Sequence, residues 1–346
     1  MIRLRLLLAL LCLSLYSVGL MSQKSYFAQY QIPDLMLSSG LTGSSDGKLR
    51  VQTTATLQEK NLLNSDEFRG GQISVDGNIR LTQRTELGLG AFVSHDDNGL
   101  SFHSNTYSLA SAAIHQYLGG RGDGHHLLSL GLSGGMAHRY PSAAHVYGFY
   151  CGTGLEDRQG GGFTGLSDRI VSLRLSIGGV WKYQSSTRFR TELGVSAINV
   201  NRPDVPFPSG DGTYLREDRL VLVFGLLEFS LGQSLSLIPS FRYTRVDQDQ
   251  FQMGLSPRYY FGEGYRFVQL GLLVKRGVEL GPTHGQSPKT TWIGAANLQV
   301  DYDWISVAYY GGYNNNYFSV DRVVRYSHEL SITYRLGEKR IAGSNL

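Results

Sequence analysis

Few residues of this chain have the type and spacing that metal binding or catalysis requires. His125-His126 offers two imidazoles and Asp96-Asp97 offers two carboxylates, which are ligands for transition metals and hard cations. The histidine pair opens a stretch with strand character, where adjacent side chains point to opposite faces and cannot easily hold one ion together. The acidic pair falls in an expected loop, where solvated side chains are the simpler interpretation. We therefore predict no metal site.

Three further motifs also have simpler structural interpretations. The glycine run 160–162 lacks the strand–turn–helix context in which such loops bind phosphate. Arg121-Gly122-Asp123 resembles an integrin-binding tripeptide, but its place in a short connection favours plain turn residues. No serine, histidine and aspartate follow a spacing typical of a catalytic triad. A lipase or protease embedded in a barrel is the alternative that this pattern leaves. We predict no catalytic residue, no cofactor and no enzymatic activity.

The composition narrows the class of protein to which these residues belong. Hydrophobic residues make up 41% of the 346-residue chain and charged residues only 17%, against roughly 25% charged in an average domain. The 43 glycines without a triplet period exclude collagen, and 21 tyrosines argue against disorder. A net charge of +4 is too small for a nucleic-acid surface. The two cysteines, Cys12 and Cys151, predict neither an internal disulfide nor a zinc site.

The first 22 residues have the features of a secretory signal peptide. Arg3 and Arg5 supply the positive start, and residues 6–15 supply the apolar core. Cleavage of this leader removes Cys12. Beyond it, no run reaches the roughly 18 apolar residues of a transmembrane helix. We expect an exported protein that, if it enters a membrane, does so without helices.

A period of two residues dominates the rest of the chain and predicts strands with one apolar and one polar face. In 170–181, for example, Val171, Leu173 and Leu175 alternate with serines and Arg174. Fourteen such stretches occur, most of them 11–14 residues long, which is about twice the usual strand length. They are 48–58, 70–81, 85–95, 104–118, 125–139, 169–183, 187–199, 218–231, 234–245, 249–261, 264–276, 289–302, 303–313 and 325–336.

The connections between these stretches alternate between short and long. Connections after even-numbered strands are short, and those after odd-numbered strands are mostly long, with 246–248 as the exception. Outer-membrane barrels alternate periplasmic turns with longer extracellular loops in this way. Aromatic residues near strand ends suit interfacial girdles: Trp181 with Tyr183, Trp292 with Tyr302, and Tyr259–Phe261. The fold class predicted is an all-β transmembrane antiparallel barrel; the alternative is a secreted β-sandwich or propeller.

In such a barrel the polar strand faces line the lumen, and they carry charges of both signs. We expect Arg–carboxylate networks across the lumen that hold the wall rigid, with a selectivity ring for a solute as the alternative. The expected inward-facing set is Arg50, Asp76, Arg80, Glu86, Arg174, Arg190, Glu192, Glu228, Arg242, Arg258, Asp301, Glu329 and Arg335. The domain organisation predicted is a signal peptide (1–22), an N-terminal periplasmic or plug segment (23–47), the barrel (48–336) and a C-terminal tail (337–346).

Five motifs in order resemble the PorP/SprF family, outer-membrane proteins of type IX secretion and gliding motility. They include the opening Tyr26–Tyr30, the segment Ser38–Gly43, the strand His125–Leu132 and the closing Ser327–Leu330 with Thr333-Tyr334. Ser38-Ser39 depart from the Asn-Pro usual in the family. The resemblance implies a non-enzymatic barrel in the outer membrane of a Gram-negative cell. It also implies partners: the C-terminal domain of a secreted adhesin, periplasmic lipoprotein components of type IX secretion, or both.

Aromatic residues in two long loops are the candidates for binding such a partner, because exposed aromatic side chains are favoured anchors at protein interfaces. They are Tyr140, Tyr147, Phe149, Tyr150, Phe163, Phe207 and Tyr214. Packing of these rings over the barrel mouth is the alternative. A general or substrate-specific porin is the second functional hypothesis, and a soluble exported β-protein is the third. Membrane lipid and protein, not nucleic acid, are the expected partners.

Overall fold

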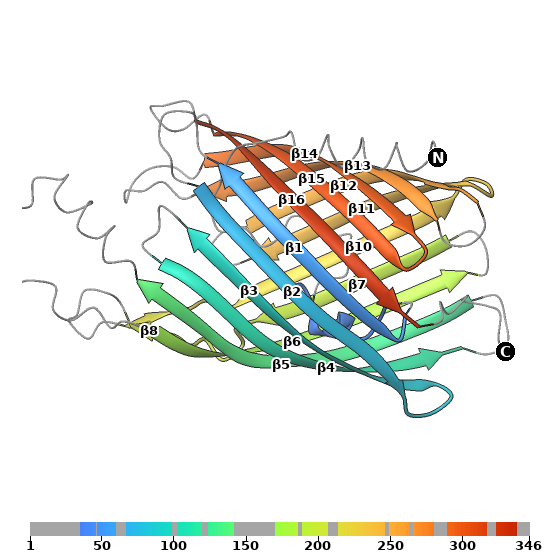
Figure 1. Ribbon diagram of the computed structural model, residues 1–346, viewed down its shortest axis with the longest axis horizontal. Coiled ribbons are helices and arrows are strands. Elements are labelled where there is room, and N and C mark those ends of the chain that lie inside the picture. The colour runs from blue at the N-terminus through green and yellow to red at the C-terminus, as the bar shows by residue number, and fades with distance from the viewer. Residues whose placement is uncertain are drawn as a thin grey trace, which may run out of the picture.

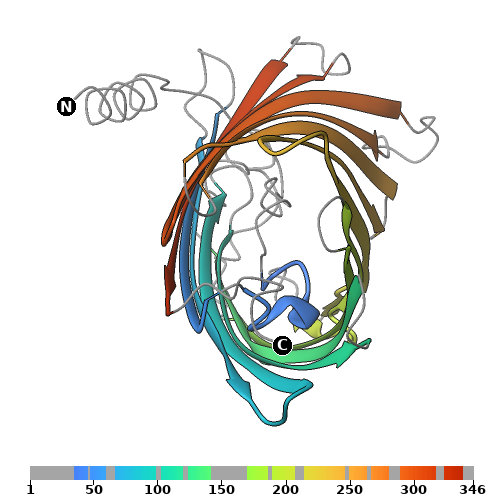
Figure 2. The same ribbon diagram turned by 90° about the vertical axis from the view of Figure 1, so that its right-hand side faces the viewer.

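Fourteen strands of the described chain form one closed antiparallel barrel (Figures 1 and 2). The computed structural model describes residues 35–45, 47–59, 67–98, 103–119, 124–141, 170–185, 189–206, 214–245, 249–262, 266–279, 289–316 and 323–337. The barrel strands are β1 (Leu49–Glu59), β2 (Glu67–Arg80), β3 (Thr85–Asn98), β4 (His103–Leu118), β5 (Gly124–Pro141), β6 (Ile170–Ser185), β7 (Phe189–Ile198), β10 (Leu220–Ser230), β11 (Leu235–Arg245), β12 (Asp249–Tyr260), β13 (Phe267–Glu279), β14 (Lys289–Tyr302), β15 (Ile305–Asn316) and β16 (Val323–Leu336).

Each strand pairs with its neighbours in the chain, and β1 pairs with β16 to close the ring. The strands run obliquely across the barrel in Figure 1, as closure of a sheet requires. The connection between β14 and β15 is one of those expected to be short, and it shows how tight the turns at one end of the barrel are. Tyr302 pairs with Ile305, and Asp303 has a φ of 55°, a left-handed conformation that aspartate tolerates in turns. We call this end the short-turn end and the opposite one the long-loop end.

The two faces of the wall differ in polarity as the alternation predicts. Outward-facing Leu130, Leu132 and Leu272 are 62–66% exposed, whereas inward-facing Glu329, Ser331 and Thr333 on β16 are almost fully buried. A soluble protein has no reason to expose a belt of large aliphatic residues on every side, whereas lipid favours it. This distribution is that of a barrel that spans a membrane. No helix within the described residues is long and apolar enough for a bilayer crossing.

Aromatic side chains lie near both ends of this apolar belt. On the short-turn side Trp304 packs edge-on against Tyr334 and Trp181 stacks near Tyr183, while Trp292 lies towards the long-loop end of β14. Trp292 and Tyr302 are ten residues apart on β14, which at about 3.4 Å per residue and a tilt of roughly 40° gives a height of about 26 Å. That height matches the apolar band of a membrane barrel.

The fourteen predicted strands are confirmed, with corrections at the long-loop end. Asp96-Asp97 does not lie in a loop, because β3 continues to Asn98 in register with β2 and β4. The expected loop 200–217 contains a hairpin of its own, formed by β8 (Asp204–Pro206) and β9 (Tyr214–Arg216). The proposed signal peptide 1–22 lies outside the described residues, and of the tail 337–346 only Gly337 is described.

Candidate functional site inside the barrel

A segment that precedes β1 lies inside the barrel and packs against one side of its wall (Figure 2). Residues 35–45 form this luminal segment, with a short 3-10 helix, η1, at Ser39–Leu41. The Ser38 side chain caps the helix by accepting a hydrogen bond from the Gly40 amide at 3.2 Å. Most residues of the segment are buried. Within the predicted plug or periplasmic segment 23–47, the described part is therefore luminal.

The wall beneath the luminal segment is made of residues with small or no side chains. Five inward-facing residues are direct cross-strand neighbours along β3, β4, β5, β6 and β7. They form what we call the small-residue row: Gly88, Ala113, Gly131, Gly178 and Ser196. Because a backbone can approach a wall closely only where side chains are absent, this row creates the space for the segment.

The approach is so close that a single extra carbon would block it. A Cβ atom at Gly131 would overlap the Ser39 carbonyl oxygen, and one at Gly88 would overlap that of Thr42. Both collisions are with backbone atoms, which cannot turn away as a flexible side chain can. The spacing of these glycines in the sequence gives no sign of the row, since it arises only when five strands are set in register.

The second half of the luminal segment is held by hydrogen bonds to the wall. His115 Nε2 donates to the Thr42 carbonyl oxygen at 2.7 Å, and the Thr42 hydroxyl donates to Ser111 at 2.9 Å. Because a carbonyl oxygen can only accept, the proton of the neutral imidazole is on Nε2. Nδ1 then accepts the Ser129 hydroxyl at 2.7 Å. The ring is therefore fixed at both nitrogens.

Asp76 joins the luminal segment to the charged part of the wall. Its Oδ2 accepts the Gly43 amide at 2.6 Å, and its Oδ1 contacts Arg50 Nε at 2.7 Å. Both side chains of this pair are at most 2% exposed. Asn78 on the same strand donates to the Gly43 carbonyl at 3.0 Å. One buried carboxylate thus accepts a backbone hydrogen bond from the segment and pairs with the guanidinium of the neighbouring strand.

Three further ion pairs among the luminal charges lie along the wall. Lys182 contacts Glu192 on the adjacent strand at 3.0 Å, and Arg335 reaches Asp301 two strands away at 2.7 Å. Nearby strands thus bring opposite charges together, and the expectation of networks across the lumen stays a prediction. Arg258 and Glu228 form a similar pair at 3.2 Å.

The inward-facing set expected from the sequence is confirmed in its main part. Its nine buried members are Arg50, Asp76, Glu86, Arg174, Glu192, Glu228, Arg242, Asp301 and Glu329. Arg190, Arg258 and Arg335 are half-buried. Arg80 differs, because it ends β2 at the short-turn rim and its side chain is 62% exposed despite its contact with Glu86.

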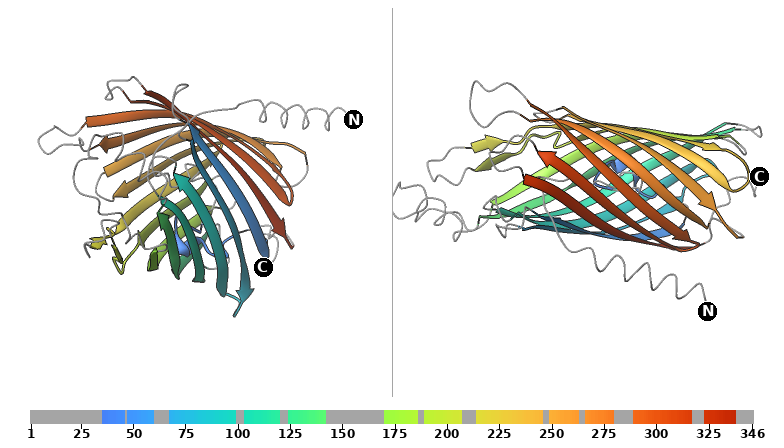
Figure 3. Two further views of the ribbon diagram at one scale, coloured as in Figure 1. Left: turned by 60° about the vertical axis from the view of Figure 1, so that its left-hand side comes forward. Right: turned by 90° about the horizontal axis from the view of Figure 1, so that it is seen from above.

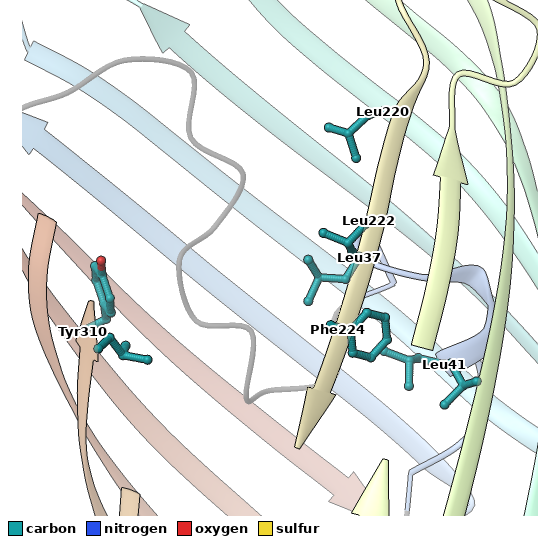
Figure 4. Packing of buried hydrophobic residues seen from close by; sticks show 8 residues of the cluster. Leu37, Leu41, Leu220, Leu222, Phe224 and Tyr310 are labelled. Atoms are coloured by element: carbon teal, nitrogen blue, oxygen red, sulfur yellow. The ribbon is translucent and has the colours of Figure 1, made fainter. Parts of the chain in front are cut away.

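Part of the luminal face is apolar, which the simple division into lipid-facing and lumen-facing residues did not predict. Leu220, Leu222 and Phe224 point inward from β10, beside Leu37 and Leu41 of the luminal segment (Figure 4). The sequence signal is present, since 220–227 is almost uniformly apolar. A strand with two apolar faces packs against lipid on one side and against protein on the other.

Two of the candidate partner-binding aromatics are among the described residues, and both lie at the long-loop end. Tyr140 is the penultimate residue of β5, and Tyr214 opens β9 opposite Pro206. The backbone places them on different elements and does not bring them together. Tyr147, Phe149, Tyr150, Phe163 and Phe207 lie outside the described residues.

The β8–β9 hairpin projects beyond the barrel at the long-loop end (Figures 1 and 3). Its base is fixed to β6, which extends past the end of β7. Arg174 Nη2 contacts Glu217 at 2.6 Å, and Asn201 bonds the carbonyl of Leu173 and the amide of Leu175. These side chains replace the strand partner that β6 lacks there. The hairpin therefore has an ordered attachment.

No group of three or more histidine, cysteine, aspartate or glutamate side chains in the described ranges is arranged to hold a metal ion. His125 and His126 follow each other on β5, and the His126 ring stacks on that of Trp181 with the ring centroids 5.9 Å apart. Its ring therefore belongs to the aromatic group on the outer side. The chemistry that the site offers is binding by hydrogen bonds and apolar contact.

Comparison with known proteins places the chain near other barrels by shape only. No family model and no curated protein matches the sequence. Among solved structures, the CymD monoaromatic hydrocarbon channel has a TM-score of 0.47 at 11% identity, covering 88% of this chain and 93% of CymD. The Pseudomonas putida toluene transporter TodX gives 0.46 at 11% identity, covering 91% and 95%. CdiB from Escherichia coli gives 0.43 at 12% identity, covering 82% and 63%.

Proposed function

We propose that this chain is a non-enzymatic barrel of the Gram-negative outer membrane that binds or anchors an exported protein at its long-loop end. The resemblance of its motifs to PorP/SprF proteins suggests type IX secretion as the setting. The observation that carries the proposal is the β8–β9 hairpin, which stands beyond the barrel on an ordered base. A surface that is already fixed before binding loses less conformational entropy when a partner docks.

The luminal segment supports the same proposal. It occupies part of the cross-section and is bonded to the wall through His115 and Asp76. A segment tied into the lumen narrows the passage that is left for solutes. A barrel that serves as a rigid base for protein contacts gains stability from one.

The test is to remove the tip of the hairpin and keep its base. Residues 207–213 are replaced by a Gly-Ser pair, which leaves Glu217 and its contact with Arg174 in place. The protein is purified in mild detergent from native cells, and the proteins that remain bound are identified. We expect the bound partner to be lost while the barrel still migrates as a folded species on unheated gels.

A matched control shortens the turn 120–123 at the opposite end of the barrel. It should leave the partner bound, because that turn faces the other side of the membrane. Equal recovery of the partner from the native protein and from the hairpin variant would contradict the proposal.

The second candidate function is a porin, and the charged lumen favours it. Arg242, Glu329 and Asp301 line the described wall with both signs of charge, as a water-filled passage would tolerate. Planar-bilayer recording separates the two functions. A steady open conductance in the purified protein supports the porin, and a silent barrel supports the anchor.

A further inference from the structure

A row of outward-facing residues crosses four neighbouring strands near the long-loop end of the barrel (Figure 1). In order they are Tyr243 on β11, Phe251 on β12, Arg276 on β13 and Trp292 on β14, each the direct cross-strand partner of the next. Phe251 and Trp292 are 36% and 59% exposed, and Arg276 is exposed between them. We call these four residues the girdle row. It places one cation between two aromatic residues on the face of the wall that meets lipid.

The girdle row lies where the apolar belt ends. Towards the middle of the wall, the same face of β13 carries Val274 and Leu272, which are 50% and 66% exposed. Trp292 marks the long-loop edge of the belt, at a height of about 26 Å from Tyr302. Partners on adjacent strands tilted by roughly 40° differ in height by about 3 Å, so Arg276 lies at the level of Trp292 to within that distance. This is the level of the lipid headgroups.

No carboxylate among the described residues neutralises the guanidinium of Arg276. The acidic residue of β12, Asp249, accepts the Tyr243 hydroxyl at 2.8 Å and lies 3.9 Å from Arg245. Within the described part of the chain, Arg276 itself has no ion pair, hydrogen bond or ring contact. Its charge is therefore available to a group outside the chain. At the level of the headgroups, the anionic group that a membrane supplies is a lipid phosphate.

The surface next to the girdle row also has room for an acyl chain. On β14 the outer face continues towards the bilayer centre with two small residues, Gly294 and Ala296. A Cβ atom at Gly294 would meet no atom within 4 Å. Its cross-strand partners, Val274 on β13 and Tyr313 on β15, are 50% and 41% exposed and flank it. An acyl chain that runs towards the bilayer centre here contacts larger side chains on both sides.

We propose that the girdle row is a binding site for a lipid with an anionic phosphate headgroup, in the leaflet at the long-loop end. The phosphate accepts hydrogen bonds from Arg276, because a guanidinium presents two parallel N–H donors that match phosphate geometry. The rings of Phe251 and Trp292 lie beside the headgroup, and the acyl chain runs over Gly294 and Ala296. The proposal concerns the membrane-facing wall and does not depend on a protein partner at the long-loop end.

The test measures which lipid is in contact with Trp292. The chain has three tryptophans, so Trp181→Phe and Trp304→Phe leave Trp292 as the fluorophore. The full protein is reconstituted into vesicles of phosphatidylglycerol and phosphatidylcholine with equal acyl chains, and one lipid at a time carries bromine near the top of its chains. Bromine quenches tryptophan fluorescence on contact, so the two sets of vesicles give the relative affinity of the lipids at this site. We expect phosphatidylglycerol to be favoured about 3- to 6-fold.

One substitution and one matched control locate the binding. Arg276→Gln should lower the preference to about equal affinity, because it removes the charge, and the exposed position at the membrane interface should leave the folded fraction on unheated gels unchanged. The control protein keeps Trp304 in place of Trp292. Trp304 lies at the short-turn end, where Arg266 contacts Asp303 at 2.8 Å, and should show no preference for either lipid.

Each other outcome overturns the proposal. Equal quenching by the two lipids with Arg276 in place means that water alone solvates this side chain. A preference that persists in Arg276→Gln, or that is as large at Trp304, means a general attraction of anionic lipid to the barrel. A preference that disappears when inorganic phosphate replaces chloride at constant ionic strength means a site for the free anion and not for the lipid.

Discussion

At the scale of single residues, the luminal segment fits because two positions of the wall lack a side chain. Gly131 and Gly88 do not have left-handed backbone conformations, so their strands would accept any residue by themselves. The requirement for glycine comes from the carbonyl groups of Ser39 and Thr42 that press on them. Glycine is therefore required at these positions by the contact with the luminal segment and not by the conformation of the strands.

Gly131→Ala should therefore displace the segment without opening the barrel. The added methyl group overpacks the contact, which typically costs about 1–3 kcal/mol. The measurement is the maleimide labelling rate of a thiol introduced by Ser39→Cys in a Cys151→Ser background. Labelling is slow while Ser39 is buried and becomes faster when the segment leaves the wall.

Gly179→Ala is the control, since a Cβ atom there meets nothing closer than 3.5 Å. It should label as slowly as the parent protein. If the thiol is also labelled slowly in Gly131→Ala, the wall has moved to accommodate the methyl group and the segment has stayed in place.

Asp76 is the residue whose charge matters most to the same contact. Asp76→Asn leaves the buried guanidinium of Arg50 without the carboxylate that it contacts, a loss of about 3–5 kcal/mol in buried pairs. It also weakens the bond to the Gly43 amide. Denaturant unfolding in vesicles should show the decrease in the free energy of unfolding. Asp204→Asn, in an exposed pair 3.8 Å from Arg216, should change it by less than about 1 kcal/mol.

At the scale of elements, the barrel strands could be predicted from the alternation, whereas the contacts between them could not. The pattern around 170–181 places Leu173 outside and Arg174 inside, as found. The row from Gly88 to Ser196 depends on the register of four strand pairs, which the sequence of one strand does not specify. The β8–β9 hairpin was missed because its three-residue strands are too short to show a period.

The hairpin is the element whose attachment is most open to test. Glu217→Ala removes the acceptor of Arg174 and of Asn199, so residues 204–216 should be cleaved faster by an added protease. Asp218→Ala is the comparison. Its pair with Arg202 is half-exposed, and its loss should have a much smaller effect on the cleavage rate. Equal cleavage rates in the two variants would place the attachment elsewhere, in the bonds of Asn201.

At the scale of the whole molecule, the surroundings of an outward-facing side chain depend on its depth in the membrane rather than on its exposed fraction. Leu272 in the middle of β13 and Leu231 beside the short β10–β11 turn are 66% and 61% exposed. In water the two sites would be equivalent. In a bilayer the first faces hydrocarbon and the second faces the interface.

Arginine substitutions at these two sites should differ accordingly. Leu272→Arg should lower folding stability in vesicles by about 2–4 kcal/mol, and Leu231→Arg by about 0–1 kcal/mol. The folded fraction on unheated gels, followed across a denaturant series, gives both values. Equal and small effects would mean that the apolar belt does not face lipid.

The position of the luminal segment also has a consequence for assembly. The segment precedes β1, yet its contacts are with β2–β7 and β10, and the ring closes only when β1 meets β16, the last barrel strand. An unclosed sheet of the first eight barrel strands, β1–β7 and β10, already contains these contacts. The segment can therefore be seated while the sheet is still open, and nothing has to be threaded through a finished pore. Closure by the C-terminal strand then encloses a part of the chain that was already in place.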